Sequence, residues 1–403
     1  GSFKEFCPIS PPRHSRSRPA LAQGADSAAQ APMADQQDFD IFLATAPGLE
    51  PVLAEEVGGK GFKRPKIVPG GVVTRGGWPE VWRANLWIRG AGRVLARIAA
   101  FRVTHLAQLD TLAHRVPWAT VLRPGIPFRV EASCAASRIY HSGAAAQRIE
   151  TAIRDTTGAT PAPDAEVTIM ARLDHDLCTI SIDTSGEPLH KRGYKQAVNA
   201  APMRETMAAL FLRQCGFDGS EPVLDPMCGS GTFVIEAAEI AARLNPGRAR
   251  HFAFEQLATF DAEAWERMRA AKSRPAPEAR FHGSDRDAGA IAMSRANAER
   301  AGVSDITAFR QCAISDITPP DGPPGLVIVN PPYGTRLGDS GQLVPLYRAL
   351  GQTLLRRFSG WRVGLVTNEP TLAYATGLPF LPHGAPVPHG GLRVVLFRTG
   401  VLG

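Results

Sequence analysis

The sequence predicts an α/β protein made of a Rossmann-like domain with a mostly parallel sheet, preceded by a smaller α/β region. Two observations predict the larger domain. Residues 223–238 read as a buried strand, a Gly-Ser-Gly turn and an apolar helix, and residues 326–338 as a buried strand followed by Asn-Pro-Pro-Tyr-Gly. The order of strand and helix patterns over residues 39–101, β-α-β-β-α-β, predicts a ferredoxin-like region.

The composition of the 403 residues is that of a globular protein, and no run approaches the roughly 20 apolar residues of a membrane span. The six cysteines form no CxxC pair, which favours a reducing compartment over a disulfide frame or zinc site. We therefore expect a cytoplasmic protein without a metal or a membrane anchor.

Positive charge is concentrated in the N-terminal half. Residues 44–163 carry 16 Lys and Arg against 8 Asp and Glu, whereas residues 200–403 carry 21 against 19. We expect a polyanion such as RNA to bind mainly to the first of these segments. A solvated basic face without a partner is the alternative.

Residues 1–38 are rich in Ala, Pro, Ser and Arg and lack hydrophobic periodicity. This pattern predicts a disordered leader or an artificial extension, with Met33 as a candidate natural start. A transit peptide is the alternative, because Arg13, Arg16 and Arg18 lie among serines.

The first folded segment, residues 39–101, contains alternating apolar strands and two helical patterns bounded by glycines. Its predicted strands are 39–45, 62–68, 71–75 and 93–101, and its predicted helices are 49–59 and 78–88. Residues 102–185 form a second α/β unit, with a strand at 127–133, an amphipathic helix at 142–158 and a strand pair at 165–173 and 177–185. Residues 186–200 read as a basic linker.

The remaining segment, residues 201–403, alternates strands and helices as a doubly wound domain does. Its predicted helices are 201–216, 232–238, 261–272, 288–302 and 343–358, and its predicted strands are 223–225, 281–287, 306–312, 326–329, 361–368 and 392–399. Residues 245–278 are an insertion rich in aromatic and charged residues.

The Gly-Ser-Gly turn predicts a cofactor site. Glycines let the backbone approach a ligand closely, and the free N–H groups at a helix start favour a carboxylate or phosphate. An acid that closes the second strand of such a fold binds ribose hydroxyls. Asp285 is the favoured acid, and Asp287 is the alternative or a helix cap.

The Asn-Pro-Pro-Tyr motif predicts a site for an amine. Two prolines remove two backbone N–H groups, so the loop offers mainly carbonyl acceptors together with the Asn330 amide. The aromatic Tyr333 can stack on a base that carries the amine.

The motifs DPMCGSGTF and NPPYG resemble those of class I S-adenosylmethionine-dependent methyltransferases that act on an exocyclic base amine. With HKRGYK at 190–195 and APMRETMAALFL at 201–212, residues 39–403 resemble the THUMP-domain guanine-N2 methyltransferases of bacterial 23S ribosomal RNA. The resemblance implies a seven-stranded sheet with a late reversed strand and a THUMP RNA-binding domain over residues 102–185. Some relatives carry a second, fused methyltransferase, and we expect that activity to be absent here.

The resemblance assigns roles to individual residues. Expected catalytic residues are Asn330, Pro331, Pro332 and Tyr333. Expected contacts of S-adenosylmethionine are Asp225, Pro226, Met227, Cys228, Gly229, Ser230, Gly231, Thr232, Asp285, Arg286, Ala313 and Asn330. Expected RNA contacts are Arg138, Tyr140, His141, Arg148, Lys191, Arg192 and Tyr194.

Adenine recognition departs from the wider superfamily, in which an acid follows the third strand. Here Cys312 or Ala313 holds that position, so Asp316 or the Ala313 amide is the substitute. Three other functions stay open: a transfer RNA guanine-N2 methyltransferase, a DNA adenine-N6 methyltransferase, and an RNA-binding assembly factor without catalysis. Sequence patterns predict neither the modified nucleotide nor the oligomeric state.

Overall fold

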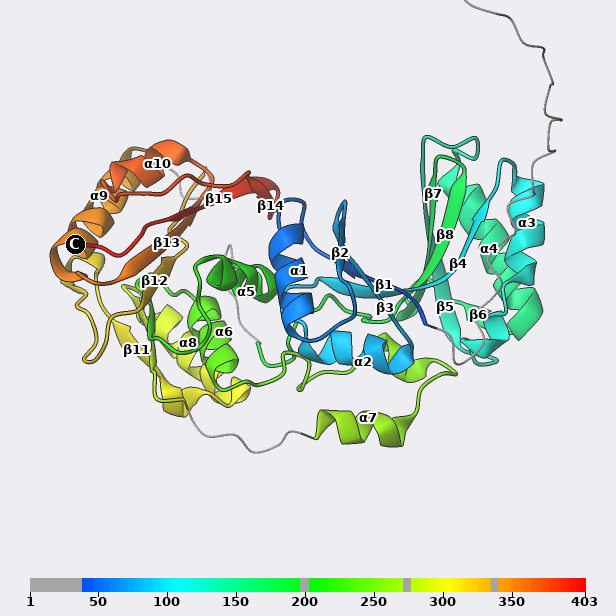
Figure 1. Cartoon of the computed structure of the whole chain (residues 1–403), viewed down its shortest axis with the longest axis horizontal. Helices are drawn as coiled ribbons and strands as arrows, with labels where there is room; N and C mark the ends of the chain where they lie inside the picture. The colour runs from blue at the N-terminus through cyan, green and yellow to red at the C-terminus, as the bar shows by residue number, and fades with distance from the viewer. Residues whose placement is uncertain (1–37, 196–202, 271–276, 335–339) are drawn as a thin grey trace, which may run out of the picture.

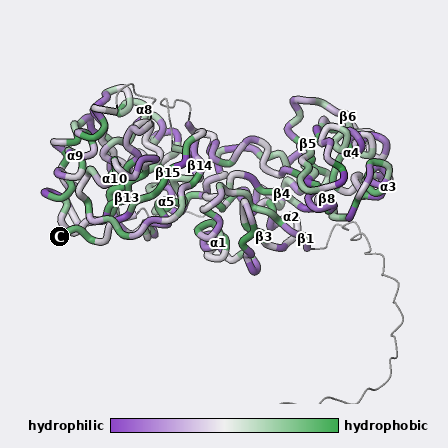
Figure 2. The backbone as a smooth tube through the Cα atoms, turned by 90° about the horizontal axis from the view of Figure 1, so that it is seen from above, coloured by the Kyte–Doolittle hydropathy of each residue, from purple (hydrophilic) through white to green (hydrophobic). Residues whose placement is uncertain are grey.

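The computed structural model describes residues 38–195, 203–270, 277–334 and 340–403. Within these residues the chain forms two sheets, one at each end of an elongated molecule (Figure 1). Hydrophobic stretches occur in both lobes (Figure 2). Residues 1–37 of the predicted leader lie outside the described residues.

The N-terminal half is built on a sheet in the order β2-β3-β1-β4-β8-β7-β5-β6. Its strands are β1 (Phe39–Ala44), β2 (Lys66–Val68), β3 (Gly71–Gly76), β4 (Arg93–Arg102), β5 (Pro127–Ala135), β6 (Thr160–Pro161), β7 (Val167–Asp174) and β8 (Leu177–Asp183). Its helices are α1 (Glu50–Gly59), α2 (Trp78–Trp87), α3 (Leu106–Arg115) and α4 (Ser142–Thr157), with a 3-10 turn at Trp118–Thr120.

The predicted β-α-β-β-α-β order over residues 39–101 is confirmed. The strand expected from residue 62 begins only at Lys66, directly after Pro65, which has no N–H to donate. Strand β4 pairs with β1 on one side and with β8 on the other, both antiparallel. The predicted units 39–101 and 102–185 therefore share one continuous sheet.

Helix α3 was not predicted from the sequence. It buries Leu109 and Ala113, which lie four positions apart, and the His105 imidazole caps it by accepting a hydrogen bond from the Gln108 N–H. An apolar stripe this narrow gives little helical signal in the sequence.

The C-terminal half has a sheet in the order β11-β10-β9-β12-β13-β15-β14. Its strands are β9 (Val223–Asp225), β10 (Phe281–Asp285), β11 (Thr307–Gln311), β12 (Leu326–Val329), β13 (Arg362–Thr367), β14 (Val387–His389) and β15 (Leu392–Arg398). Its helices are α5 (Glu205–Gln214), α6 (Thr232–Ala241), α7 (Ala262–Arg269), α8 (Ala288–Ala301), α9 (Ser340–Arg357) and α10 (Pro370–Ala375), with 3-10 turns at Ala253–Gln256, Ser304–Ile306 and Ile314–Asp316.

Five neighbouring strands of this sheet, from β11 to β13, run parallel, and β15 pairs antiparallel with β13. The Rossmann-like fold and the late reversed strand are thus confirmed. Strand β10 ends at Asp285, two residues before the predicted end, because Asp287 caps α8 by accepting a hydrogen bond from the Gly289 N–H.

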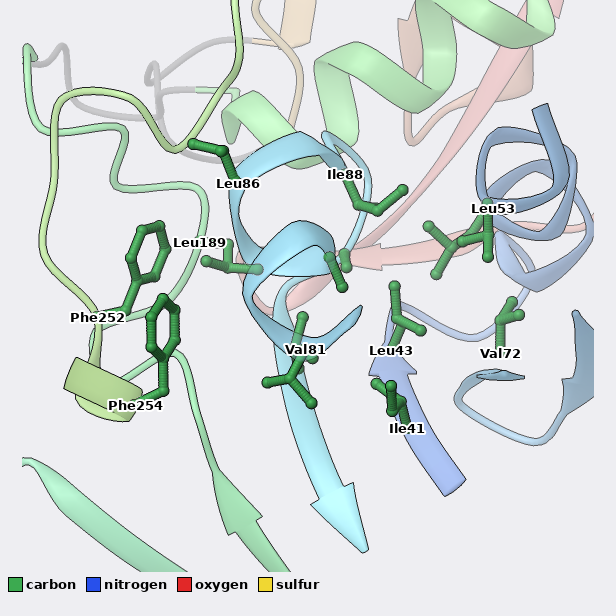
Figure 3. Close-up of a cluster of buried hydrophobic side chains, with 14 of the residues drawn as sticks. Ile41, Leu43, Leu53, Val72, Val81, Leu86, Ile88, Leu189, Phe252 and Phe254 are labelled. Carbon is green, nitrogen blue, oxygen red and sulfur yellow. The ribbon is translucent and has the colours of Figure 1, made fainter. Parts of the chain in front are cut away.

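The insertion after α6 joins the two halves through aromatic side chains. Phe252 and Phe254 stack with ring centroids 5.2 Å apart, and Phe254 also packs 6.1 Å from Trp82 of α2. Both phenylalanines belong to the buried cluster that contains Val81 and Leu86 of α2 (Figure 3). The described part of the insertion therefore fixes the ferredoxin-like region against the second domain.

A buried charge cluster joins the halves at a second place. Arg89, from the segment before β4, lies 3.0 Å from Glu236 and 3.4 Å from Glu239, and both glutamates belong to α6. Arg192 lies 3.0 Å from Glu236, and Arg248 lies 2.8 Å from Glu239. Burial alone would raise the pKa of Glu236, but Arg192 and Arg89 hold that pKa below its ordinary value.

We predict that Glu236→Ala lowers the free energy of unfolding by about 3 to 5 kcal/mol, because it leaves Arg192 buried without its carboxylate partner. Urea titration measures the change. The matched control is Glu263→Ala, which removes an exposed partner of Arg267 in α7 and should cost less than about 0.5 kcal/mol. Equal losses in the two variants would contradict a structural role for the cluster.

Candidate active site

The predicted cofactor and amine motifs meet at one edge of the second sheet. Strands β10, β9 and β12 are parallel neighbours, so their carboxyl ends lie along the same edge. Asp225 is the last residue of β9, Asp285 is the last of β10, and Asn330 directly follows β12. Ligands of open α/β sheets bind at this edge.

The Gly-Ser-Gly turn is anchored by the neighbouring strand and helix. The Gly229 N–H donates a hydrogen bond of 3.0 Å to the Asp285 carboxylate. From α8, the buried Ser294 hydroxyl donates to the Gly229 carbonyl at 2.7 Å, and the buried Asn297 amide donates to the Ser230 carbonyl at 3.0 Å. Sequence reasoning missed Ser294 and Asn297, because nothing local marks which face of α8 meets the turn.

Two glycines of the turn have left-handed backbone conformations, with φ of 55° at Gly229 and 85° at Gly231. A Cβ atom at Gly231 would lie 3.1 Å from Ser294 Oγ and 3.3 Å from the Phe309 ring. The left-handed backbone and the tight space both favour glycine at this position. Helix α6 begins at the next residue, Thr232, so its first N–H groups lie beside the turn.

Two carboxylates flank the turn in different environments. Burial raises the pKa of Asp225 to about 8, and the nearby Asp285 adds to this effect. Asp225 accepts a hydrogen bond of 3.0 Å from the Met227 N–H. Asp285 is partly exposed and accepts a second hydrogen bond of 3.0 Å from the Asp287 N–H, so its carboxylate is fixed in orientation at the edge.

The ends of β10 and β11 are linked beside the turn. The Cys312 N–H donates to the Asp285 carbonyl at 2.9 Å, and the Gln311 side chain donates to the Arg286 carbonyl at 3.0 Å. Arg286 and Ala313 therefore lie at the sheet edge where they were predicted. Asp316, the alternative to Ala313, lies in the 3-10 turn that follows.

The Asn-Pro-Pro-Tyr loop has one buried acceptor without a partner in the described chain and another that a neighbouring helix holds. The Asn330 Oδ1 atom is buried and has no hydrogen-bond partner in the described chain. The hydroxyl of buried Tyr347 donates to the Pro332 carbonyl at 3.1 Å and contacts Thr367 Oγ1 at 3.2 Å. Tyr333 packs partly buried against the cores on both sides of the loop. Tyr347, which sequence reasoning missed, therefore fixes the loop from α9.

The basic linker reaches the turn through Lys195. Its ammonium donates to Thr232 Oγ1 at 2.9 Å and lies 3.0 Å from the Glu205 carboxylate. Lys191 is exposed and pairs with Glu187 at 2.8 Å. The rest of the predicted linker, residues 196–200, lies outside the described residues.

Two predicted RNA contacts in this linker are wrong. Arg192 and Tyr194 are only 2% and 4% exposed. The Arg192 guanidinium donates to Glu236 and to the carbonyls of Leu189 and Arg89, so it is committed to the protein interior. These two side chains therefore pack at the junction between the two halves of the protein and are not available to RNA.

Four of the other predicted RNA contacts, Arg138, Tyr140, His141 and Arg148, lie between β5 and α4 or on α4, at the end of the molecule opposite β11 and α8 (Figure 1). Tyr140 is 84% exposed, and the Arg138 and Arg148 side chains are also exposed. The His141 imidazole caps α4 by accepting a hydrogen bond from the Ala144 N–H at 3.0 Å. These four residues and the exposed Lys191 of the linker stay predictions for RNA binding.

Within the described residues, no group of His, Cys, Asp and Glu side chains is arranged to hold a metal ion. Nor does any described helix combine the length and apolar character needed to cross a membrane.

The parallel sheet with its reversed strand, the glycine turn and the Asn-Pro-Pro-Tyr loop define the class I methyltransferase fold. Residues 192–378 match the UPF0020 family, described as the RMKL-like methyltransferase domain, and residues 40–95 match the RlmL ferredoxin-like domain. These matches identify an RlmL-like methyltransferase domain and an RlmL-like ferredoxin-like domain in the chain. Neither match covers residues 102–185, so the THUMP assignment stays a prediction.

Curated relatives include two proteins named ribosomal RNA large subunit methyltransferase K/L. The protein from Methylococcus capsulatus is 37% identical over 358 residues, which cover 84% of this chain and 48% of that protein. The protein from Psychromonas ingrahamii is 34% identical over 355 residues, which cover 84% of this chain and 47% of that protein. The chain spans about half the length of these relatives.

Solved structures share the whole architecture. SMU.472, described as a putative methyltransferase complexed with SAH, has a TM-score of 0.81 at 27% identity. The likeness covers 91% of this chain and 99% of that protein. The N-terminal sheet and the methyltransferase domain therefore occur together in both proteins.

We predict that Gly231→Ala destabilises the fold more than Gly302→Ala does. Both glycines are left-handed, with φ of 85° and 74°, so each substitution should cost about 1 to 2 kcal/mol. A Cβ at Gly302 meets open space, whereas one at Gly231 crowds Ser294, which should add about 1 kcal/mol or more. Equal midpoints in urea titrations of the two variants would contradict the crowding of the turn.

Proposed function

We propose that this protein transfers a methyl group from S-adenosylmethionine to the exocyclic N2 amine of a guanine in large-subunit (23S) ribosomal RNA. The observation that carries the proposal is the buried Asn330 Oδ1 atom, which lacks a partner in the described chain and lies at the same sheet edge as the glycine turn. A buried carbonyl oxygen left unpaired is unfavourable by about 1 to 3 kcal/mol, so a substrate N–H fits it. The names of the K/L relatives support ribosomal RNA.

The residues of the edge fit S-adenosylmethionine. The Asp285 carboxylate is held at the end of β10, where it suits two ribose hydroxyls. The glycine turn, from Pro226 to Thr232, brings backbone N–H groups to the start of α6, where a carboxylate is favoured. Asp225 suits the cofactor's ammonium group, and Arg286 and Ala313 flank the place for its adenine.

Bound S-adenosylmethionine supplies an activated methyl group on a sulfonium, and the leaving group departs neutral. The protein's task is then to align the amine, within about 3 to 3.5 Å of the methyl carbon. Asn330 Oδ1 and the Pro331 carbonyl accept hydrogen bonds from the two N–H groups of the amine. These two hydrogen bonds orient the amine so that its lone pair faces the methyl group. The Pro332 carbonyl is already occupied by Tyr347, which keeps Pro331 in place.

The same acceptors stabilise the transition state. As nitrogen gains positive charge during transfer, a fixed carbonyl and amide oxygen bind its hydrogens more strongly than in the ground state. Water takes the proton from the methylated cation, so no strong base is needed. Tyr333 stacks on a base that has left its helix.

The N-terminal half supplies RNA affinity. Its surplus of positive charge favours a polyanion, and Arg138, Tyr140, His141 and Arg148 lie together between β5 and α4 or on α4. Residues 39–101 and 102–185 act as one RNA-binding platform, with residues 102–185 as the THUMP part. We expect the protein to meet this RNA in the cytoplasm.

A labelled-methyl assay on ribosomal RNA, transfer RNA and DNA tests the proposal. The expected product is N2-methylguanosine in 23S ribosomal RNA. N2-methylguanosine in transfer RNA instead would show that transfer RNA is the substrate. N6-methyladenine in DNA would show that the target is a DNA adenine. No methyl transfer to any of the three nucleic acids would favour an assembly factor without catalysis.

We predict that Asn330→Ala lowers the methyl-transfer rate by roughly 100-fold, because it removes an acceptor of the aligned amine. Its affinity for S-adenosylmethionine in calorimetry should stay within about twofold of wild type. The matched control is Asn245→Ala, at an asparagine beyond the end of α6 that is opposite the glycine turn, and its rate should not change. A normal rate for Asn330→Ala would refute the alignment role.

We predict that Asp285→Ala weakens S-adenosylmethionine binding by roughly 10- to 100-fold, because charge-assisted hydrogen bonds to the ribose are lost. Calorimetric titration measures the dissociation constant. The control Asp287→Ala removes the α8 cap, so it should lower stability by about 1 kcal/mol while affinity persists. Unchanged affinity in Asp285→Ala would exclude this residue from the ribose site.

A further inference from the structure

A second buried amide oxygen lies at the active edge. Strands β12 and β13 are parallel neighbours with Val329 opposite Leu365, and Asn368 directly follows β13 as Asn330 follows β12. The Asn368 Oδ1 atom is buried without a hydrogen-bond partner in the described chain. Among the described residues, two asparagine side-chain oxygens are buried without a partner, those of Asn330 and Asn368. Both lie at this edge of the sheet.

Asn368 faces the Asn-Pro-Pro-Tyr-Gly loop. Its Nδ2 atom lies 3.8 Å from the position that a Cβ atom on Gly334 would take. Next to Asn368, Thr367 is tied to the same loop, because its hydroxyl contacts the Tyr347 hydroxyl that donates to the Pro332 carbonyl. The loop is therefore bounded by Asn330 at its start and by Asn368 at its end.

We infer that Asn368 reads the Watson–Crick edge of the target base by accepting a hydrogen bond from guanine N1–H, an inference that rests on the proposed function. Guanine carries two adjacent donor groups on this edge, the N2 amine and N1–H. Two buried acceptors on neighbouring strand ends match these two donors. Asn330 takes the amine that reacts, and Asn368 takes the neighbouring N1–H.

This arrangement discriminates between bases. Adenine also presents an amine, but its ring N1 is an acceptor, so a lone pair would face the Asn368 oxygen. The Asn-Pro-Pro-Tyr loop alone suits the amine of guanine or of adenine, whereas the Asn368 oxygen favours guanine. Asn368 is thus a specificity residue, and Asn330 holds the reacting nitrogen.

The test compares guanine with 2-aminopurine at the methylated position of a 23S ribosomal RNA fragment. 2-Aminopurine keeps the reacting amine but has an unprotonated N1 and no O6. The wild-type chain should prefer guanine by roughly 10- to 100-fold in kcat/KM, and Asn368→Ala should abolish most of this preference. Asn368→Asp, which keeps an acceptor, should retain the preference for guanine, and Asn245→Ala should behave as wild type.

An unchanged guanine preference in Asn368→Ala would overturn the inference, and so would loss of the preference in Asn368→Asp. Calorimetry with S-adenosylmethionine shows whether the variants are folded, since Asn368 is not expected to contact the cofactor. If the wild-type chain methylates no guanine, the proposed function and this inference fail together. If it methylates guanine but all variants share one preference, only this inference fails.

Discussion

Buried charge pairing on one face of α6 sets the geometry of the molecule. The helix begins at Thr232, beside the glycine turn, and carries Glu236 and Glu239 on its next turns. These carboxylates bind Arg89 of the N-terminal half and Arg192 of the linker, away from water. An unpaired charge there would be very unfavourable, so the two halves have to meet in one arrangement.

The cluster extends into the ferredoxin-like core. Glu56 of α1 accepts hydrogen bonds from the N–H groups of Arg89 and Gly90, at 2.6 and 2.9 Å. The position of Arg89 is therefore fixed by the N-terminal sheet and its helices, while its guanidinium is fixed by α6. This junction fixes the N-terminal sheet, which carries the proposed RNA-binding surface, relative to the sheet edge proposed as the active site.

Features that depend on a short stretch of sequence were predicted correctly. The strand that ends at Val329, directly before Asn330, and the glycine turn follow from local patterns of apolar residues, glycines and prolines. Asp285 and Asn330 meet in space because parallel strands end together, a consequence of the fold class. The seven strands of the second sheet and its late reversed strand followed from the resemblance, whereas the order of the strands was not predicted.

Features that depend on distant partners were not predicted. Arg192 was predicted to contact RNA, yet it is buried and its guanidinium donates a hydrogen bond to Glu236, which lies 44 positions further along the chain. Ser294, Tyr347 and Lys195 support the site through contacts that no local pattern marks. The continuous N-terminal sheet depends on β4 pairing with β8, strands about 80 residues apart.

The central claim is that fixed acceptors at the sheet edge aim a guanine amine at the methyl group of the cofactor. A crystal structure with S-adenosylhomocysteine and a guanine-containing RNA measures this most directly. The account predicts guanine N2 within about 3 Å of Asn330 Oδ1 and facing the cofactor sulfur. A base amine held away from Asn330, with the cofactor outside the glycine turn, would contradict it.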